Sequence, residues 1–335
     1  MGDPNYVVHG AGAIGSVLAA RLSEAGARVG LVARGLHLGA LQDAGLRLSG
    51  QTVGTYDLPA AATAHDLEVD EDTVVILAMK SGDTEQAVAA HSDLYADLPI
   101  VCSQNGVTNE QLLSEAGYRV YGCTVMVGAA ISAPGEVSHS GGELLSIGCW
   151  PDGNDEVSER LVADLVAGSM KARTHPHIEA NKWGKLVRNL GNAHLALTNL
   201  SVQEAICQPS DRWFLADVQE EAANALDAAG IDYEFLGRRT MREQIENLRT
   251  EGIWRPQVRE DPTVRSYPST WQDLDARRPT VEVDHFNGTI VRLGEQHGVS
   301  TALNRVLRDV CEAAAAALLG PGSETTESLR ALAAR

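Results

Sequence analysis

The sequence has no apolar run long enough to cross a membrane, since a spanning helix needs about 18 apolar residues. Its longest candidate, Ala313–Leu319, is short and suits one face of a helix. No basic leader precedes the apolar residues that begin at Tyr6. We therefore expect no signal peptide and a cytoplasmic protein.

Positive charge is also scarce. The chain has 27 Lys and Arg against 45 Asp and Glu, a formal net charge of −18. Such a surface repels nucleic acid and anionic membranes at long range, which excludes both as partners. Any anionic ligand therefore needs cations or backbone dipoles of its own at the binding site.

Cysteines are few and follow no pairing motif. The chain has five, an odd number, and they are widely spaced with no CxxC pair: Cys102, Cys123, Cys149, Cys207 and Cys311. This pattern suggests neither a disulfide framework nor a zinc knuckle. We expect reduced, mostly buried thiols and no metal site.

Aromatic residues make up only 4% of the chain, so the cores must be built mainly from Ala, Leu and Val. The 44% hydrophobic and 21% charged content is typical of folded globular proteins rather than disordered ones. A length of 335 residues exceeds one ordinary core and predicts two domains.

The first 34 residues predict a strand, a tight turn, a helix and a second strand, which together form a βαβ unit. Apolar runs predict further strands within 72–79, 98–102 and 118–127. The resulting alternation is typical of a doubly wound α/β sheet. Beyond about residue 175 the pattern becomes helical, with expected helices at 181–200, 212–229, 238–249, 281–297 and 304–319 and a proline-bearing loop at 250–270. The predicted domains are 1–175, a Rossmann-type α/β domain, and 176–335, an all-helical domain.

The turn after the first strand reads Gly10-Ala11-Gly12-Ala13-Ile14-Gly15, a G-x-G-x-x-G motif. Its first glycine permits a sharp turn, its second leaves room for a pyrophosphate, and its third lets the helix pack close to the sheet. The N–H groups that begin the helix attract phosphate without a basic surface. In its βαβ context the motif predicts dinucleotide binding, with a purely structural turn as the alternative.

Arg34 follows the second strand, about 20 residues past the glycines. NAD enzymes usually carry an acidic residue there for the ribose hydroxyls, whereas an arginine can clamp a 2′-phosphate. The residue thus favours NADPH over NADH. An ordinary surface arginine is the alternative interpretation.

Lys185, Asn189 and Asn192 fall at i, i+4 and i+7 of a predicted helix, so one face would carry an ammonium and two amides. A polar site and a solvated helix face explain this pattern equally well. The spacing alone does not decide between them.

Seven short segments occur in the order and spacing of one known family: Gly10–Gly15, Val32–Arg34, Ala78–Ser81, Gln104–Gly106, Pro134–His139, Lys182–Leu186 with Asn189, and Val281–Gly288. On these segments the chain resembles the ketopantoate reductase family along nearly its whole length. The resemblance implies an NADPH-dependent reductase with its site in the cleft between the two domains.

The resemblance also implies residue roles. Lys185 matches the general acid, which protonates the carbonyl oxygen as hydride arrives. Asn189 and Ser269 match residues that hold the substrate. Glu282 matches an acidic residue that binds cofactor and substrate, and its charge would keep Lys185 protonated.

Two further matches concern the cofactor side. Asn105 matches a residue between nicotinamide and substrate, and Lys80 matches a cofactor contact near the phosphate and ribose. The helical domain is also the candidate surface for a homodimer.

The chain departs from the family pattern at Ala193, where a second asparagine is usual. Asn192 stands one residue earlier, and a shift of one residue turns a helical side chain by about 100°. The segment 236–268 is longer than the family pattern and carries Arg255, Arg259 and Arg265. The substrate therefore need not be ketopantoate.

The function expected from the sequence is reduction of a small 2-oxo acid to a 2-hydroxy acid, by default ketopantoate to pantoate in pantothenate biosynthesis. One alternative is a reductase of the same family that acts on another carbonyl or an imine. A second is a non-catalytic NADPH-binding module, against which Lys185 and Glu282 speak because such a module needs no acid at the hydride site.

Overall fold

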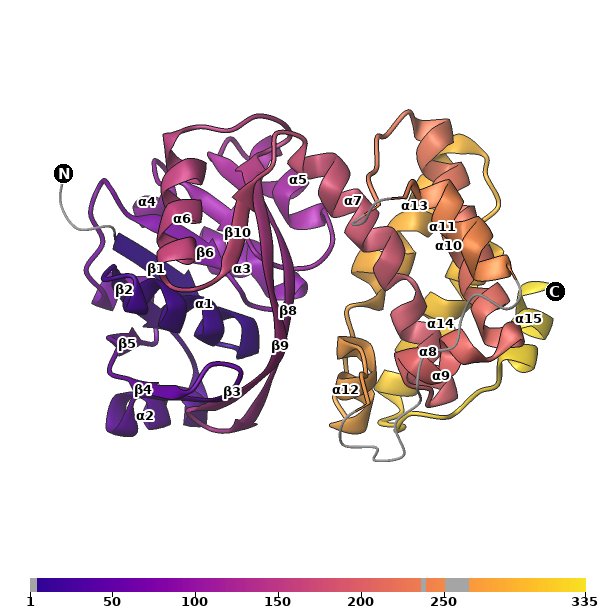
Figure 1. Ribbon diagram of the computed structural model, residues 1–335, viewed down its shortest axis with the longest axis horizontal. Helices are drawn as coiled ribbons and strands as arrows, with labels where there is room; N and C mark the ends of the chain where they lie inside the picture. Colours follow the sequence, from indigo (N-terminus) through magenta and orange to yellow (C-terminus); the bar gives the residue numbers. More distant parts are fainter. Residues whose placement is uncertain (1–4, 236–238, 251–264) are drawn as a thin grey trace. The chain divides into compact units, whose positions relative to one another are not determined.

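The computed structural model describes residues 5–235, 239–250 and 265–335 (Figure 1). The chain divides into two compact units, Met1–Lys182 and Trp183–Arg335, called unit 1 and unit 2 below. The border falls inside helix α7 (Ile178–Asn189), which therefore belongs in part to each unit. The domain limits predicted from the sequence, 1–175 and 176–335, stay a prediction.

A mixed sheet forms the frame of unit 1. Six of its strands run parallel in the order β5-β2-β1-β6-β7-β8, so that β1 lies where the strand order reverses. Ligands of such sheets bind beyond the carboxyl end of the strands at this reversal. In the described part of the chain the sheet has ten strands: β1 Asn5–His9, β2 Arg28–Val32, β3 Leu46–Gly50, β4 Gly54–Tyr56, β5 Ala60–Ala61, β6 Val74–Leu77, β7 Ile100–Cys102, β8 Val120–Ala133, β9 Glu136–Cys149 and β10 Lys171–Thr174.

A long antiparallel hairpin, β8–β9, extends the parallel strands. The first residues of β9, Glu136–His139, also pair with β3, and its later residues, Leu144–Ile147, pair with β10. One strand therefore joins segments that lie far apart in the sequence.

Two hydrophobic cores cover the two faces of the sheet because successive side chains of a strand point to opposite faces. Tyr6 and Val8 pack with residues of α1 and α6, whereas Val7 packs with residues of α3, α4 and α5. Helices on both faces of a largely parallel sheet confirm the predicted α/β fold class. The helical elements of this unit are α1 Ala13–Glu24, α2 Gly35–Ala44, α3 Thr84–Ala89, α4 Ser92–Tyr95, α5 Thr108–Glu115, α6 Glu156–Ala167 and the 3₁₀ turns η1 Ala64–Asp66 and η2 Ser81–Asp83.

The regular secondary structure in the described residues of unit 2 is entirely helical. Its longest helix, α10, begins with Pro209 in the first turn and ends at Gly230, whose φ of +67° suits a left-handed cap. Helix α10 packs against α11, α13 and α14. The elements after α7 are α8 Gly191–Thr198, α9 Val202–Cys207, α10 Pro209–Ala229, α11 Met241–Arg249, α12 Ser269–Asp275, the π-helical turn η4 Asp284–Gly288, α13 Thr289–His297, α14 Ala302–Ala316 and α15 Thr326–Ala333.

Several local expectations were wrong. The single helix expected at 181–200 is two helices, α7 and α8, and the helix expected at 281–297 contains the π-helical turn η4 before α13. The loop expected to reach residue 270 ends earlier, because α12 begins at Ser269. Arg255 and Arg259 lie outside the described residues.

Two expectations about composition can be compared with the structure. None of the five cysteines, all of which lie within the described residues, forms a disulfide, and Cys102, Cys123 and Cys311 are buried as expected. Within the described ranges, no helix combines the length and the apolar character that a membrane span requires.

Candidate active site

The turn between β1 and α1 is tightly packed at its first glycine. Gly10 has a φ of +110°, and a Cβ atom built there would lie 2.4 Å from the backbone nitrogen of Met79. The N–H groups of Gly10 and Ala11 both donate to the carbonyl oxygen of Val32, at 3.1 and 3.0 Å. The turn is therefore fixed between the ends of β2 and β6.

The other two glycines differ in the space around them. A Cβ atom at Gly15 would lie 2.2 Å from the carbonyl oxygen of Gly10, so α1 needs glycine there to approach the strand. At Gly12 the nearest atom, the carbonyl oxygen of Ala78, would be 3.9 Å away. The first main-chain bond of α1 runs from Ser16 to Gly12, which leaves the preceding N–H groups outside the helical ladder. This open, donor-lined turn fits a pyrophosphate.

Arg34 lies two residues after the end of β2 and is the N-cap residue of α2. Its Nη2 lies 2.7 Å from Oδ2 of Asp83, which ends the turn η2 after β6. Since β2 and β6 flank β1, this ion pair connects the two segments on either side of the glycine turn. Both side chains remain accessible, with exposures of 78% for Arg34 and 46% for Asp83. Arg34, for which phosphate binding was predicted, thus lies beside the turn and next to a carboxylate that was not among the predicted site residues.

His9, the last residue of β1, adds no positive charge to this region at neutral pH. Burial lowers the pKa of its imidazole to about 4, and the nearby His91 and Arg34 contribute in the same direction. The ring instead forms a hydrogen bond with the hydroxyl of Tyr95, at 3.0 Å. Arg34 is therefore the charged side chain at the ends of β1 and β2.

Lys80 and Asn105 follow neighbouring strands. Lys80 is the N-cap residue of η2, three residues after the end of β6, and Asn105 lies in the segment after β7. The hydroxyl of Ser81 donates to the carbonyl oxygen of Asn105, at 3.4 Å. The structure thus joins the segment of Lys80 to the segment of Asn105 at the carboxyl ends of β6 and β7.

A buried ion pair lies next to the segment that contains Asn105. The ammonium of Lys182 contacts the carboxylate of Glu110, and their side chains are 2% and 1% exposed. Burial raises the pKa of Glu110, although the Lys182 ammonium acts in the opposite direction. Neither residue was predicted as part of the site.

Lys185 and Asn189 lie on α7, whereas Asn192 lies on α8. The three residues therefore do not lie on the one continuous helix that was expected from the sequence. The hydrogen-bond pattern changes at Leu190, whose N–H donates to Val187 three residues back and whose carbonyl accepts from the side chain of Asn287.

The polar residues of unit 2 that were predicted to belong to the site are all partly exposed, and buried residues lie next to them. Asn192 reaches the surface, whereas Ala193, at the position where the family has its second asparagine, is buried. The partly exposed residues are Lys185, Asn189, Asn192, Ser269 and Glu282. Asn192 is thus the residue of this pair that a ligand could contact.

Ser269 and Glu282 begin two structural elements of unit 2. Ser269 is the first residue of α12, which packs against α8 and so lies on a helix next to that of Asn192. Glu282 lies two residues before the π-helical turn η4, a type of element often found at functional sites. The carbonyl of Glu282 accepts a hydrogen bond from the N–H of His285, at 3.0 Å.

A buried amide network supports the break between α7 and α8. Asn287 donates to the carbonyl of Leu190 at 3.2 Å and to Oδ1 of Asn304 at 3.0 Å. Asn304 in turn donates to Glu221 at 2.9 Å, and the Glu221 carboxylate also accepts the N–H groups of Leu303 and Asn304. Burial raises the pKa of Glu221. The network ties η4, α10 and α14 to the break.

Some of these additional residues had a signal in the sequence. Lys182 precedes Lys185 by three residues and so lies near the same face of the helix. Asp83 follows Lys80 by the same interval. Their partners, Glu110 and Arg34, are 72 and 49 positions away, which local spacing does not reveal.

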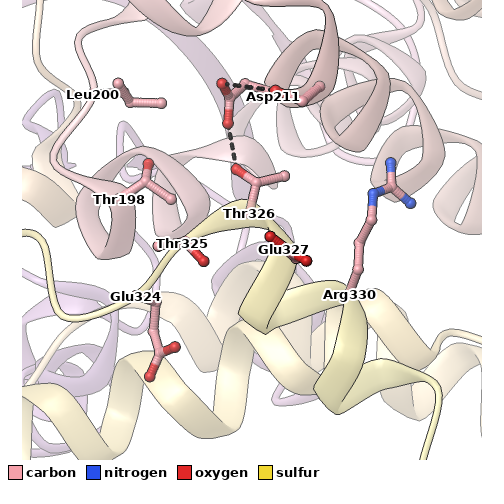
Figure 2. Close-up of a pocket in the computed structure, with 9 residues that line it drawn as sticks. Thr198, Leu200, Asp211, Glu324, Thr325, Thr326, Glu327 and Arg330 are labelled. Atoms are coloured by element: carbon pink, nitrogen blue, oxygen red, sulfur yellow. Dashed lines mark hydrogen bonds between the residues drawn. The ribbon is translucent and has the colours of Figure 1, made fainter.

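A separate pocket of about 560 Å³ lies within unit 2, and none of the predicted site residues lines it. Figure 2 shows Thr326 pointing toward Asp211, to which it donates a hydrogen bond. The imidazole of His194 contacts the same hydroxyl, at 2.8 Å. These bonds join α15 to α8 and α10. Among the residues that the structure describes, no group of three or more His, Cys, Asp or Glu side chains could hold a metal ion.

Comparison with known proteins identifies the family. The model of the family described as ketopantoate reductase PanE/ApbA matches residues 6–152, and the model of its C-terminal part matches residues 177–315. The chain belongs to the ketopantoate reductase family. The recognition made from the seven sequence segments is thereby confirmed, and family membership supports an oxidoreductase that reduces a small 2-oxo acid with a nicotinamide dinucleotide.

Individual relatives cover nearly the whole chain. The 2-dehydropantoate 2-reductase of Archaeoglobus fulgidus is 31% identical over 90% of this chain and 94% of its own length. A ketopantoate reductase of the PanE/ApbA family from Ralstonia eutropha has a similar crystal structure, with a TM-score of 0.79 and 27% identity over 93% of this chain and 99% of that one. D-mandelate dehydrogenase, solved with NADH and anilino(oxo)acetate, has a TM-score of 0.80 at 22% identity over 94% of this chain and 99% of that one, which shows a shared fold.

Proposed function

We propose that this member of the ketopantoate reductase family catalyses the NADPH-dependent reduction of a 2-oxo acid to a 2-hydroxy acid, by default ketopantoate to pantoate, in the cytoplasm. The observation that carries the proposal is that the two family models match both units of the chain. Pantothenate biosynthesis is the corresponding pathway.

The glycine turn and its neighbours suit the cofactor. NADPH, when bound, supplies the hydride. The open space at Gly12 and the N–H groups at the start of α1 would hold the pyrophosphate. Arg34 would bind the 2′-phosphate, and Lys80 would approach the phosphate and ribose.

Lys185 is the proposed general acid. It would donate a proton to the carbonyl oxygen of the substrate and stabilise the negative charge that develops on that oxygen. Glu282 would keep the ammonium of Lys185 protonated and contact cofactor and substrate. Asn105 would lie between nicotinamide and substrate.

The substrate contacts are assigned to Asn189, Asn192 and Ser269. The buried Ala193 removes the amide that the family pattern places at that position. Because the polar side chains that would contact the substrate differ from those of the family pattern, the substrate need not be ketopantoate. A panel of 2-oxo acids, other carbonyls and imines, assayed by loss of NADPH absorbance, would rank the substrates by kcat/KM.

The deciding experiment measures NADPH oxidation with ketopantoate for the wild type and for Lys185→Ala. We expect turnover to fall by about a hundredfold or more, as for loss of a general acid. Lys171→Ala is the matched control, because Lys171 is a largely exposed lysine on β10, and its turnover should stay unchanged. Absence of turnover in a wild type that binds NADPH would reject ketopantoate as the substrate. Equal rates in wild type and Lys185→Ala would reject the assigned acid.

A further inference from the structure

The ammonium of Lys182 makes three directed contacts inside unit 1. It donates to the carbonyl oxygen of Gln104 at 3.0 Å, to the carbonyl oxygen of Cys102 at 3.4 Å and to the carboxylate of Glu110. An ammonium has three N–H donors, so these three acceptors use its full capacity. Lys182 is therefore committed to this segment and is not available to a ligand.

The sheet is shaped to admit the lysine stem. A Cβ atom built at Gly122 of β8 would lie 3.3 Å from Cδ of Lys182 and 2.9 Å from Cγ1 of Ile178. Gly122 is paired with Cys102 of β7 in the sheet. A side chain at position 122 would thus crowd both α7 residues, and glycine lets the ammonium reach the end of β7.

All three acceptors belong to one short stretch of chain. Cys102 ends β7, Gln104 follows it, and Glu110 lies in the first turn of α5. The ammonium therefore joins the two ends of the segment 103–109. We call the contact of Lys182 with these acceptors the lysine clamp.

The segment inside the clamp is held from its other side as well. Ser103 donates to the carbonyl of Leu77 through its hydroxyl at 2.7 Å, and Gln104 donates to the hydroxyl of Thr84 at 2.9 Å. Within 98–107 Asn105 is the single residue that is not buried. The segment is thus held at Ser103 and Gln104, and Asn105 is left partly exposed.

The chemistry of the lysine clamp indicates that it orients the segment that contains Asn105 rather than adding stability to the fold. A buried ion pair is commonly no more stabilising than an apolar pair of the same volume, because both charges lose their hydration. Packing alone would therefore be served equally well by two apolar side chains. Two of the three ammonium N–H groups are instead directed at backbone carbonyls, which fixes the peptides on the N-terminal side of Asn105.

We propose that Lys182 and Glu110 are positioning residues that hold Asn105 in the geometry required at the nicotinamide end of the cofactor. The inference rests on the proposed function, which assigns Asn105 to that end. Lys182 also lies on α7, the helix that carries Lys185 three residues later. One side chain thereby sets the backbone of the Asn105 segment and anchors the start of the helix that carries the proposed acid.

The test compares two nucleotides in the wild type and in Lys182→Met. NADPH contains the nicotinamide, whereas adenosine 2′,5′-bisphosphate contains only the phosphorylated adenosine part. We expect Lys182→Met to raise the Kd of NADPH about tenfold and to leave the Kd of adenosine 2′,5′-bisphosphate within twofold. The kcat should fall by about a hundredfold, since a misplacement of about 1 Å near the reacting atoms costs that much.

Two further variants separate positioning from folding. Glu110→Met combined with Lys182→Met removes both buried charges, so its Tm should exceed that of Lys182→Met while its NADPH affinity and kcat stay low. Asp155→Ala is the matched control, because Asp155 caps α6 and binds Arg119 and Tyr121 in the same unit. It should lower the Tm and leave both Kd values unchanged.

The outcomes distinguish failure of the positioning role from failure of the proposed function. Equal binding of NADPH by the wild type and a folded clamp variant, with equal kcat, would overturn the positioning role. An equal loss of affinity for NADPH and for adenosine 2′,5′-bisphosphate would also overturn the positioning role, because the effect would then extend over the whole nucleotide site. If the wild type bound neither nucleotide, the proposed function would fail and the clamp inference would fail with it.

Discussion

Arg34 and Asp83 form an exposed ion pair beside the glycine turn, and under the proposed function this pair would affect how the site selects its cofactor. A 2′-phosphate carries negative charge and competes with Asp83 for the guanidinium. Exposed ion pairs of this kind contribute at most about 1 kcal/mol, so phosphate can displace the carboxylate. With a cofactor that lacks the phosphate, the carboxylate of Asp83 would be able to accept a hydrogen bond from a ribose hydroxyl.

We therefore predict that Asp83→Asn raises the ratio of kcat/KM for NADPH over NADH by about fivefold, the equivalent of about 1 kcal/mol. Arg34→Gln should lower the same ratio by about tenfold or more, because a charge-assisted bond to phosphate is lost. Initial rates with each cofactor at fixed substrate measure both ratios. A fall of the ratio in Asp83→Asn would show instead that Asp83 holds Arg34 ready for the phosphate.

The π-helical turn η4 and the break between α7 and α8 depend on each other through Asn287. This side chain bonds the carbonyl of Leu190, at the break, and the amide oxygen of Asn304. Asn189 and Asn192 lie on the two sides of the break. The directions of both side chains therefore depend on a residue about 100 positions away.

We predict that Asn287→Leu lowers the free energy of unfolding by about 2–4 kcal/mol, because two buried oxygen acceptors lose their donor. The kcat should fall by about tenfold through displacement of Asn189 and Asn192. Denaturant unfolding and steady-state kinetics measure the two effects. Thr289→Val, at a buried residue that follows η4 directly, is the control, and a loss as large as that of Asn287→Leu would point to a general weakness of this segment.

At the same scale, local pattern predicted the elements that depend on local sequence. The strands β1, β2, β6 and β7 are short apolar runs, and the glycine turn carries its own conformational requirement at Gly10. Strand β9 was missed because Glu136–Cys149 contains two adjacent glycines and several polar residues, and only pairing with β8, β3 and β10 makes it a strand. The break at Leu190 was missed for the same reason, since Asn287 determines it from a distance.

The residues of the candidate site likewise fall into two groups, those that local sequence identifies and those that depend on distant contacts. Residues that belong to a motif, such as Gly12, Arg34 and Lys185, could be named from the sequence. The spacing of Lys182 from Lys185 marks it as a neighbour of the site, but its pairing with Glu110 could not be predicted, because the two residues are 72 positions apart. Their roles follow from burial and hydrogen-bond partners, which no spacing rule contains.

Across the whole molecule, acidic groups outnumber basic ones. The 27 Lys and Arg cannot neutralise the 45 Asp and Glu even if every cation is paired, and the net charge of −18 remains. Excess charge of one sign destabilises the compact state through self-repulsion. Dissolved salt screens this repulsion over a distance of about 8 Å at physiological ionic strength.

We predict that the Tm rises by several degrees when NaCl is increased from about 0.02 to 0.5 M, since screening relieves repulsion among the unpaired carboxylates. Differential scanning calorimetry at constant pH measures the change. Sucrose at the same osmolality is the control for effects that do not depend on charge. A Tm that falls with NaCl would mean that the surface ion pairs outweigh the excess carboxylates.

The position of strand β9 late in the sheet-forming sequence also affects the nascent chain during synthesis. Strand β3 leaves the ribosome some 85 residues before β9, so at about 5–20 residues per second it waits roughly 4–17 s for its parallel partner. During that interval its backbone is an open edge to which another chain could attach. A substitution that weakens β9 should therefore act during synthesis, by promoting aggregation of incomplete chains. Chaperones would have to prevent this aggregation before any complete enzyme has formed.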